Sequence, residues 1–158
     1  MTQIKSLEET SSAETRLAAA GIVLPELPAP GGNYLSAKTV GTLVYLAGVI
    51  SSDEHGVVTG QVSDVDAGYR AARLCGLTQL AVLKRHLGSL DAVKSAVSVN
   101  GYVNAPEGFA DSPKVVNGFS DLLVEIFGDA GRHVRAAVGV SALPRNAMVE
   151  VQMVVEIF

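Results

Sequence analysis

The sequence contains no tryptophan and only one cysteine, Cys75, among its 158 residues. A lone cysteine excludes an internal disulfide framework and any zinc site built from several cysteines. Aromatic residues make up only 5% of the chain, so the core must consist mainly of small aliphatic side chains. No apolar run approaches the roughly 20 residues that span a bilayer. These absences favour a compact soluble domain with Cys75 in its core.

Positive charge is also scarce, with 12 Lys and Arg against 16 Asp and Glu and a net charge of −4. Nonspecific nucleic-acid binding needs several cations on phosphates, so this balance argues against a nucleic-acid partner. The first residues, MTQIKSLEETSSAETR, are polar and mixed in charge. They do not resemble a secretory signal, and we therefore expect a cytoplasmic protein with no membrane partner.

Motifs that hold cofactors are missing as well. The sequence has no GxGxxG, P-loop or GxSxG motif. Its three histidines, His55, His86 and His133, do not have the spacing of metal ligands. The sequence therefore predicts neither a metal site nor a cofactor.

Hydrophobic residues, 48% of the chain, are arranged as one domain at residues 34–158 behind an N-terminal arm at 1–33. In the arm, Ser12 and Gly21 have the residue types of a helix cap and a helix stop. The following LPELPAPGGN is rich in proline and glycine and is typical of a linker.

Periodicity within the domain predicts the order β-β-α-β-α-β-β. One helix follows a capping box at Ser63–Asp66 and stops at Gly88, and a second begins with Pro113. The predicted elements are strands at 34–38 and 42–50, a helix to 87, a strand at 92–105, a helix at 112–127, and strands at 133–142 and 148–158. This order indicates an α+β fold with one mixed sheet and both helices on one face. The small apolar residues of the other face favour coverage by another chain.

Two charges, Arg135 and Glu150, interrupt the apolar pattern of the last two strands. Period-two alternation puts both on the face that we expect to turn away from the helices. The arginine fork matches a carboxylate, although a surface or interface ion pair is an equally simple interpretation. A hairpin through Pro144 would separate the two residues by on the order of 20 Å. A shared site would then need a neighbouring subunit.

Three further positions are candidates for a ligand cleft. Asn117 lies off the apolar stripe of its helix and could bind either a ligand or a loop. Tyr34 follows Gly31 and Gly32 and could overhang a cleft or lie at a rim. Gly48 interrupts an apolar strand, which indicates close approach of the backbone to a ligand or to packed neighbours.

Several stretches resemble the RidA/YjgF family, and in particular its longer branch, labelled endoribonuclease L-PSP-like. They are GGNYLSAKTVGTLVYLAGVIS, LGSLDAVKSAVSVNGYVNAPEGF, VVNGFSDLLVEIFGDAGRHVRAAVGVSALP and AMVEVQMVVEI, and the likeness covers about residues 16–157. The resemblance implies a chorismate-mutase-like fold. It also implies a homotrimer whose sheets enclose a central barrel, with ligand clefts between subunits.

The resemblance also implies roles for the candidate residues. Arg135 matches the arginine that holds a substrate carboxylate, and Glu150 the acid that orients the hydrolytic water. Tyr34, Gly48 and Asn117 match residues that line the cleft. Two positions depart from the archetype, which often has Cys or Ser where this chain has Ala137, and Ser where it has Ala47. Ala137 would still border the substrate, with fewer polar contacts.

The activity implied by the resemblance is that of an enamine/imine deaminase, which converts a 2-imino acid and water to a 2-keto acid and ammonia. A protein that binds or senses small carboxylates without catalysis is an alternative that uses the same arginine. An endoribonuclease, as in the family label, is a remote alternative, because the chain has a net charge of −4 and no array of base-stacking aromatics.

Overall fold

A computed structural model describes residues 11–158. Residues 1–10, where we predicted the start of the N-terminal arm, lie outside the described part. The described chain forms a mixed sheet in the order β1-β2-β8-β6-β7. Strand β3 follows β2 along the same edge of β8. The strands are β1 (Ala37–Val40), β2 (Leu43–Leu46), β3 (Val49–Ile50), β6 (Val93–Asn104), β7 (Val134–Val140) and β8 (Val149–Ile157). The predicted mixed sheet is confirmed.

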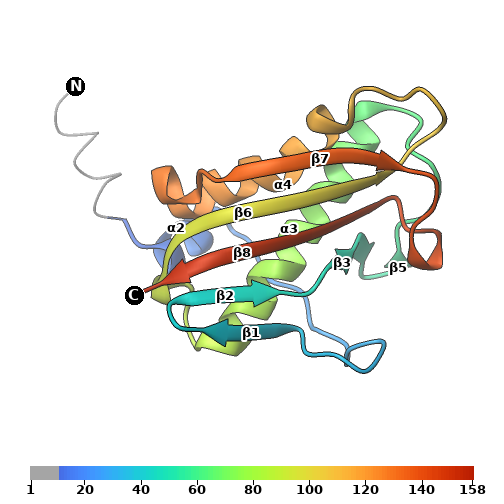
Figure 1. Ribbon diagram of the computed structural model, residues 1–158. Coiled ribbons are helices and arrows are strands. Elements are labelled where there is room, and N and C mark those ends of the chain that lie inside the picture. The colour runs from blue at the N-terminus through green and yellow to red at the C-terminus, as the bar shows by residue number, and fades with distance from the viewer. Residues whose placement is uncertain (1–10) are drawn as a thin grey trace, which may run out of the picture.

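Two helices, α3 (Val65–Leu87) and α4 (Ser112–Phe127), cover one face of this sheet, as predicted (Figure 1). The opposite face carries no helix (Figure 1). Glycines allow the helices to approach closely, because a Cβ at Gly118 would collide with the Tyr69 carbonyl. The core consists mainly of Val, Leu and Ala, and Cys75 is fully buried in it. Burial raises the pKa of the Cys75 thiol.

Sequence patterns located most element boundaries within a few residues. Gly88 ends α3 in the left-handed conformation, and Gly41 (φ 62°) forms the turn between β1 and β2. The predicted capping box was displaced by one residue, since Asp64 rather than Ser63 caps α3 through a 2.7 Å bond from the Ala67 N–H. The polar loop after β3 contains a small unpredicted ribbon, β4 (Ser52–Asp53) with β5 (Gly56–Val57).

The predicted hairpin of the last two strands was wrong. Strand β6 lies between them, parallel to β7 and antiparallel to β8. Helix α4 carries the chain back so that β7 runs alongside β6, and residues 141–148 then cross the end of β6. Buried Asn104 holds this crossing, because its side chain donates to Asn146 Oδ1 (3.2 Å) and the Ala147 carbonyl (3.0 Å).

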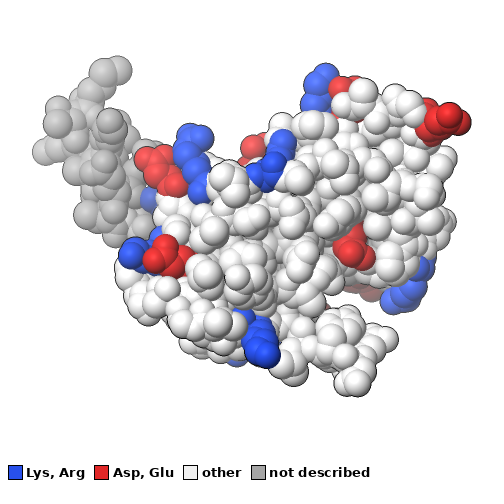
Figure 2. Space-filling model, viewed as in Figure 1, with Lys and Arg blue, Asp and Glu red and all other residues white. Residues whose placement is uncertain are grey.

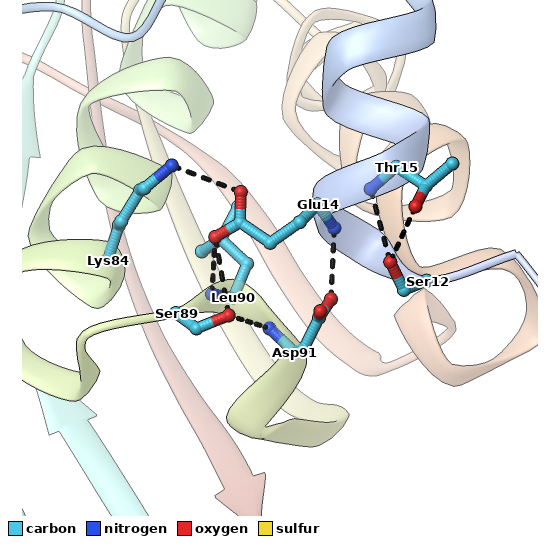
Figure 3. A network of polar contacts seen from close by, with 7 residues as sticks. All are labelled: Ser12, Glu14, Thr15, Lys84, Ser89, Leu90 and Asp91. Carbon is cyan, nitrogen blue, oxygen red and sulfur yellow. Dashed lines mark hydrogen bonds and ion pairs between the residues drawn. The ribbon is translucent and has the colours of Figure 1, made fainter.

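The arm places its predicted helix, α2 (Ala13–Ala19), against the domain. Ser12 caps it by accepting from the Thr15 N–H at 3.1 Å. Glu14 accepts hydrogen bonds from the Lys84 ammonium (3.0 Å) and the Leu90 N–H (2.9 Å), as Figure 3 shows. Leu17 is buried against the core. These contacts clamp α2 to the end of α3 and the short 3₁₀ turn at Leu90–Ala92.

Among the helices of residues 11–158, none combines the length and the apolar character needed to cross a membrane.

Candidate functional site

Arg135 lies on the edge strand β7, opposite Val99 of β6, and its side chain reaches α4. Nη1 donates to Asn117 Oδ1 at 2.8 Å and to Ser120 Oγ at 3.1 Å, and Nη2 donates to the Pro113 carbonyl at 3.3 Å. The three acceptors occur at steps of four and three residues and so share one face of α4. The structure thus brings Arg135 and Asn117, two predicted site residues, into direct contact.

All three acceptors of Arg135 are uncharged. Within residues 11–158 no carboxylate forms an ion pair with Arg135, whereas five other Lys or Arg side chains lie within ion-pair distance of an acid. The described chain therefore does not contain the ion pair that the sequence offered as an alternative role for this arginine. Its positive charge remains available to a ligand that carries a negative charge.

The predicted face of Arg135 needs correction. We expected the valines of β7 to face the helices, but Val134 and Val138 are 70% and 46% exposed on the helix-free face. Arg135 and Ala137 point toward α4 instead. The reason is that β7 is an edge strand, so its helix-facing side lies beyond the close-packed core. The period-two pattern identified two faces but did not say which one the helices cover.

Glu150 lies on the helix-free face, as predicted, because its neighbours Val149 and Val151 are fully buried beneath the helices. The carboxylate lies against Gly48, where a Cβ would be only 2.9 Å from Oε2. Partial burial raises the pKa of Glu150. Its backbone pairs with β3 and β6, but no group of the described residues forms a hydrogen bond or ion pair with its carboxylate. Glu150 is therefore a carboxyl group with a raised proton affinity and unused acceptors.

The backbone beside Glu150 is fixed from the other side of the sheet by Gln79. This buried side chain donates from Nε2 to the Ala47 carbonyl (2.8 Å) and the Val151 carbonyl (3.2 Å). A trans peptide directs its carbonyl and N–H in opposite directions, so the Gly48 N–H turns away from Gln79. The close approach at Gly48 is to the Glu150 carboxylate, which is the packing alternative that the sequence left open; its approach to a ligand stays a prediction.

Tyr34 is 52% exposed on the loop before β1. The Ala47 N–H donates to the Ser36 carbonyl at 2.9 Å, so the segment that carries Tyr34 runs beside the segment that carries Gly48. Figure 2 shows a notch where this loop stands away from the sheet. Tyr34 thus belongs to the Glu150 end of the molecule, and among residues 11–158 no hydrogen bond joins its side chain to Arg135.

Arg135 and Glu150 lie on opposite faces of the sheet. Arg135 of β7 pairs with Val99 of β6, and Val99 pairs with Met153 of β8. Glu150 therefore lies two strands from Arg135 and three residues along β8 from Met153. Standard strand spacings then put their Cα atoms on the order of 14 Å apart. One chain therefore presents two separate groups, an arginine group (Arg135, Asn117 and Ala137) and a glutamate group (Glu150, Gly48 and Tyr34).

The helix-free face is mostly uncharged. Figure 2 shows white surface across its centre, with charged side chains at its margins and one acidic patch between β3 and the start of β8. Strand register places Tyr45, Val154, Tyr102, Val134 and Val138 on this face. The same register also places Asn100, Gln152 and Glu150 there, so the face is mixed. Its exposed Tyr45, Val134 and Val138 are the apolar part that is typical of a protein interface.

Sequence reasoning missed Ser120 and His133, which lie behind Arg135. The hydroxyl of Ser120 is 2.9 Å from His133 Nε2, and His133 Nδ1 is 2.7 Å from the Gly131 carbonyl. The spacing of Ser120 from Asn117 is a signal for a shared helix face. His133 also falls on the Arg135 side by alternation. Gln79 was missed because it stands alone within an apolar helical stripe.

Comparisons with known proteins agree with this geometry. Residues 14–157 match the family described as "YjgF/chorismate_mutase-like, putative endoribonuclease". The chain is 41% identical over 142 residues to protein TCP17 of Trypanosoma cruzi, covering 87% of this chain and 89% of the relative. It is 31% identical to a 2-iminobutanoate/2-iminopropanoate deaminase of Dermatophagoides farinae, covering 86% and 94%.

Among solved structures, protein Atu1372 of Agrobacterium tumefaciens, a protein of unknown function, has the same fold. Its TM-score is 0.83 at 37% identity, with 92% of this chain and 94% of that chain covered. The matched region includes both the arginine group and the glutamate group. The chain belongs to the YjgF/RidA family and has its mixed α+β, chorismate-mutase-like fold.

Proposed function

We propose that the protein is an enamine/imine deaminase that hydrolyses 2-imino acids to 2-keto acids and ammonia. The observation that carries the proposal is the uncompensated charge of Arg135, whose described partners are all neutral. A small carboxylate is the ligand that this fork would bind most strongly. The deaminase name of a relative that is 31% identical supports the same choice of substrate.

The reaction needs few chemical devices beyond positioning. The substrate carboxylate binds Arg135, water adds to the C=N carbon, and collapse of the adduct releases ammonia and leaves the 2-keto acid. Glu150 takes a proton from the attacking water and gives it to the imine nitrogen. As the adduct collapses, Glu150 carries the hydroxyl proton to the amine, which leaves as ammonia. The raised pKa of Glu150 suits this exchange, because a general base works best when its pKa is near the pH at which the enzyme operates. Tyr34, Gly48 and Asn117 border the bound substrate.

The cleft is composite in this proposal. Because the arginine and glutamate groups lie on opposite faces of one sheet, a second copy must bring its glutamate group to the arginine group of the first. The helix-free face, uncharged at its centre, supports packing of copies against one another (Figure 2). We propose a homotrimer, in which each pair of neighbouring chains forms one cleft.

The test uses 2-iminopropanoate generated in situ by an amino acid oxidase, with ammonia release as the readout. We expect wild-type protein to accelerate release and Arg135→Ala to lose at least a hundredfold in kcat/KM, since the variant loses a bidentate charged contact. Arg132→Ala is the matched control, because Arg132 is exposed and pairs only with nearby Asp129. Full activity of Arg135→Ala, with its oligomeric state unchanged, would refute the carboxylate-binding role.

A second candidate is a carboxylate sensor without catalysis, which the side chains of Ala47 and Ala137 favour because neither offers a polar contact to a reacting group. Titration calorimetry with pyruvate distinguishes the two. Pyruvate binding that depends on Arg135, together with no acceleration of ammonia release, supports the sensor. Acceleration by wild-type protein excludes it.

A further inference from the structure

A continuous chain of hydrogen bonds runs behind the arginine group. It leads from the Gly131 carbonyl to His133 Nδ1 (2.7 Å), from His133 Nε2 to Ser120 Oγ (2.9 Å), and from Ser120 Oγ to Arg135 Nη1 (3.1 Å). Two of its members, Ser120 and His133, have no part in the proposed reaction. Their arrangement nevertheless determines what Arg135 can bind.

The direction of each hydrogen bond follows from its fixed ends. A backbone carbonyl only accepts, so His133 Nδ1 carries the proton. In the neutral imidazole Nε2 is then an acceptor, and the Ser120 hydroxyl donates to it. With its proton committed to His133, the Ser120 oxygen directs its lone pairs toward the Nη1 group of Arg135, which can only donate.

This chain decides which edge of the guanidinium stays open. Arginine has five N–H donors, and three are taken by Asn117, Ser120 and the Pro113 carbonyl on one face of α4. The Nη1–Nη2 edge therefore faces the helix. The N–H of Nε and the remaining N–H of Nη2 lie together on the adjacent edge, and they form the fork that a carboxylate accepts bidentately.

We infer that Ser120 and His133 are positioning residues that hold the guanidinium of Arg135 so that its Nε–Nη2 edge meets the ligand carboxylate. The inference rests on the proposed function, because it assumes that Arg135 binds a carboxylate. Without an acceptor at His133, the Ser120 hydroxyl is free to rotate its proton toward Arg135. The guanidinium then loses one of the two bonds that fix Nη1.

The surroundings of His133 keep the imidazole neutral. Burial lowers its pKa from the ordinary value of 6.5; the bond to the Gly131 carbonyl raises it and the positive charge of Arg135 lowers it, and the net direction is down. On β6, the residue paired with neighbouring Val134 is the uncharged Ser98. Charged groups on the elements packed around it are engaged elsewhere or lie at a distance: Asp121 with Tyr69, Glu125 with Arg73, Arg132 with Asp129, and Arg16 against Gly128.

The experiment compares two substitutions at His133. His133→Gln keeps an acceptor within reach of Ser120, whereas His133→Leu removes it. Calorimetric titration with pyruvate at pH 7.5 should show a Kd within about twofold of wild type for the glutamine variant. For His133→Leu and Ser120→Ala we expect Kd to rise about tenfold, the effect of one lost hydrogen bond to a charged group. His86→Gln, at a histidine bonded to Thr39 and remote from Arg135, is the control.

Two results would overturn the inference. One is wild-type affinity in a folded His133→Leu variant. The other is a glutamine variant as weak as the leucine variant, which would indicate a packing role only. If wild-type protein binds no pyruvate, the proposed function fails instead, and ¹⁵N NMR of the histidines then decides on the inference. A neutral His133 with its proton on Nδ1, and a shift of Nε2 in Ser120→Ala, are expected; a proton on Nε2 would refute the chain.

Discussion

The substitution Gly48→Ala tests directly whether activity depends on the position of the Glu150 carboxylate. A Cβ at this position would lie 2.9 Å from Glu150 Oε2 and 3.3 Å from its Cδ. Ordinary contact begins at 3.4 Å, so the carboxylate must move by about half an ångström. Since Oε2 is the far end of a flexible side chain, this movement costs little, and we expect a change of less than about 1 kcal/mol in the free energy of unfolding.

Activity should respond far more than stability. Misplacing a catalytic group by 1 Å costs about a hundredfold in rate, so half that displacement should lower kcat for 2-iminopropanoate about tenfold. The Kd for pyruvate should stay within about twofold, because Arg135 is untouched. Gly31→Ala is the matched control, since a Cβ there meets nothing within 4 Å.

A double-mutant cycle isolates the cause. If Gly48→Ala acts by displacing the Glu150 carboxylate, it should have no further effect in a Glu150→Ala background, because the displaced group is gone. An unchanged tenfold loss in that background would show that Gly48 acts on the substrate directly. Wild-type kcat for the single variant would refute the role of Glu150 position altogether.

Three further predictions concern charge and assembly. Because burial raises the pKa of Glu150 in the folded state, its ionised form destabilises the protein at pH values above that pKa. Glu150→Gln should therefore raise Tm at pH 8, and this gain should vanish as the pH falls below the pKa of an ordinary glutamate; an equal gain at both pH values would contradict it. Glu14→Ala should lower stability by about 1 kcal/mol in urea unfolding, because the Leu90 N–H loses its acceptor. Glu14 has a lowered pKa, so this loss should shrink as the pH falls through that pKa. Val134→Glu should yield monomers in light scattering and lose activity, because Val134 lies on the apolar helix-free face; an active trimer would place the interface elsewhere.

Patterns in the sequence were sufficient for elements whose ends carry strong local chemistry. Gly88 and Pro113 marked helix boundaries because their backbone preferences act within one or two residues. The apolar alternation of Val149 to Val155 likewise identified a strand, whose alternate residues are buried on the helix side and which pairs on both edges. Such local signals do not depend on which segments meet in space.

Strand pairing escaped prediction because it depends on competition between distant segments. A hairpin through Pro144 was the nearest option, yet β8 pairs with β6 along nine positions. Asn104 stabilises the crossing by bonds to Asn146 and Ala147, some forty residues away. The wrong prediction for the face of Arg135 has the same cause, because only the strand pairing shows that α4 lies over this side of β7.

The candidate site divides in the same way. The residue types of Arg135 and Glu150 were conspicuous, since isolated charges in apolar strands require an explanation. Ser120, His133 and Gln79 gave no such signal, because each acts through a neighbour that only the fold supplies. Sequence thus identified groups that would touch a ligand more readily than those that hold them in place.

Subunit complementation tests whether the site is shared between chains. Arg135→Ala and Glu150→Gln should each be nearly inactive alone. In co-expressed trimers, a shared cleft takes its arginine from one chain and its glutamate from the next. Such a cleft is intact when the first chain carries Glu150→Gln and the second carries Arg135→Ala. Random assembly at equal expression makes this true for about a quarter of the clefts, so about a quarter of wild-type activity should return. A site built within one chain would contain a substitution in every copy. Its activity would remain at the level of the single variants, and the composite cleft would be refuted.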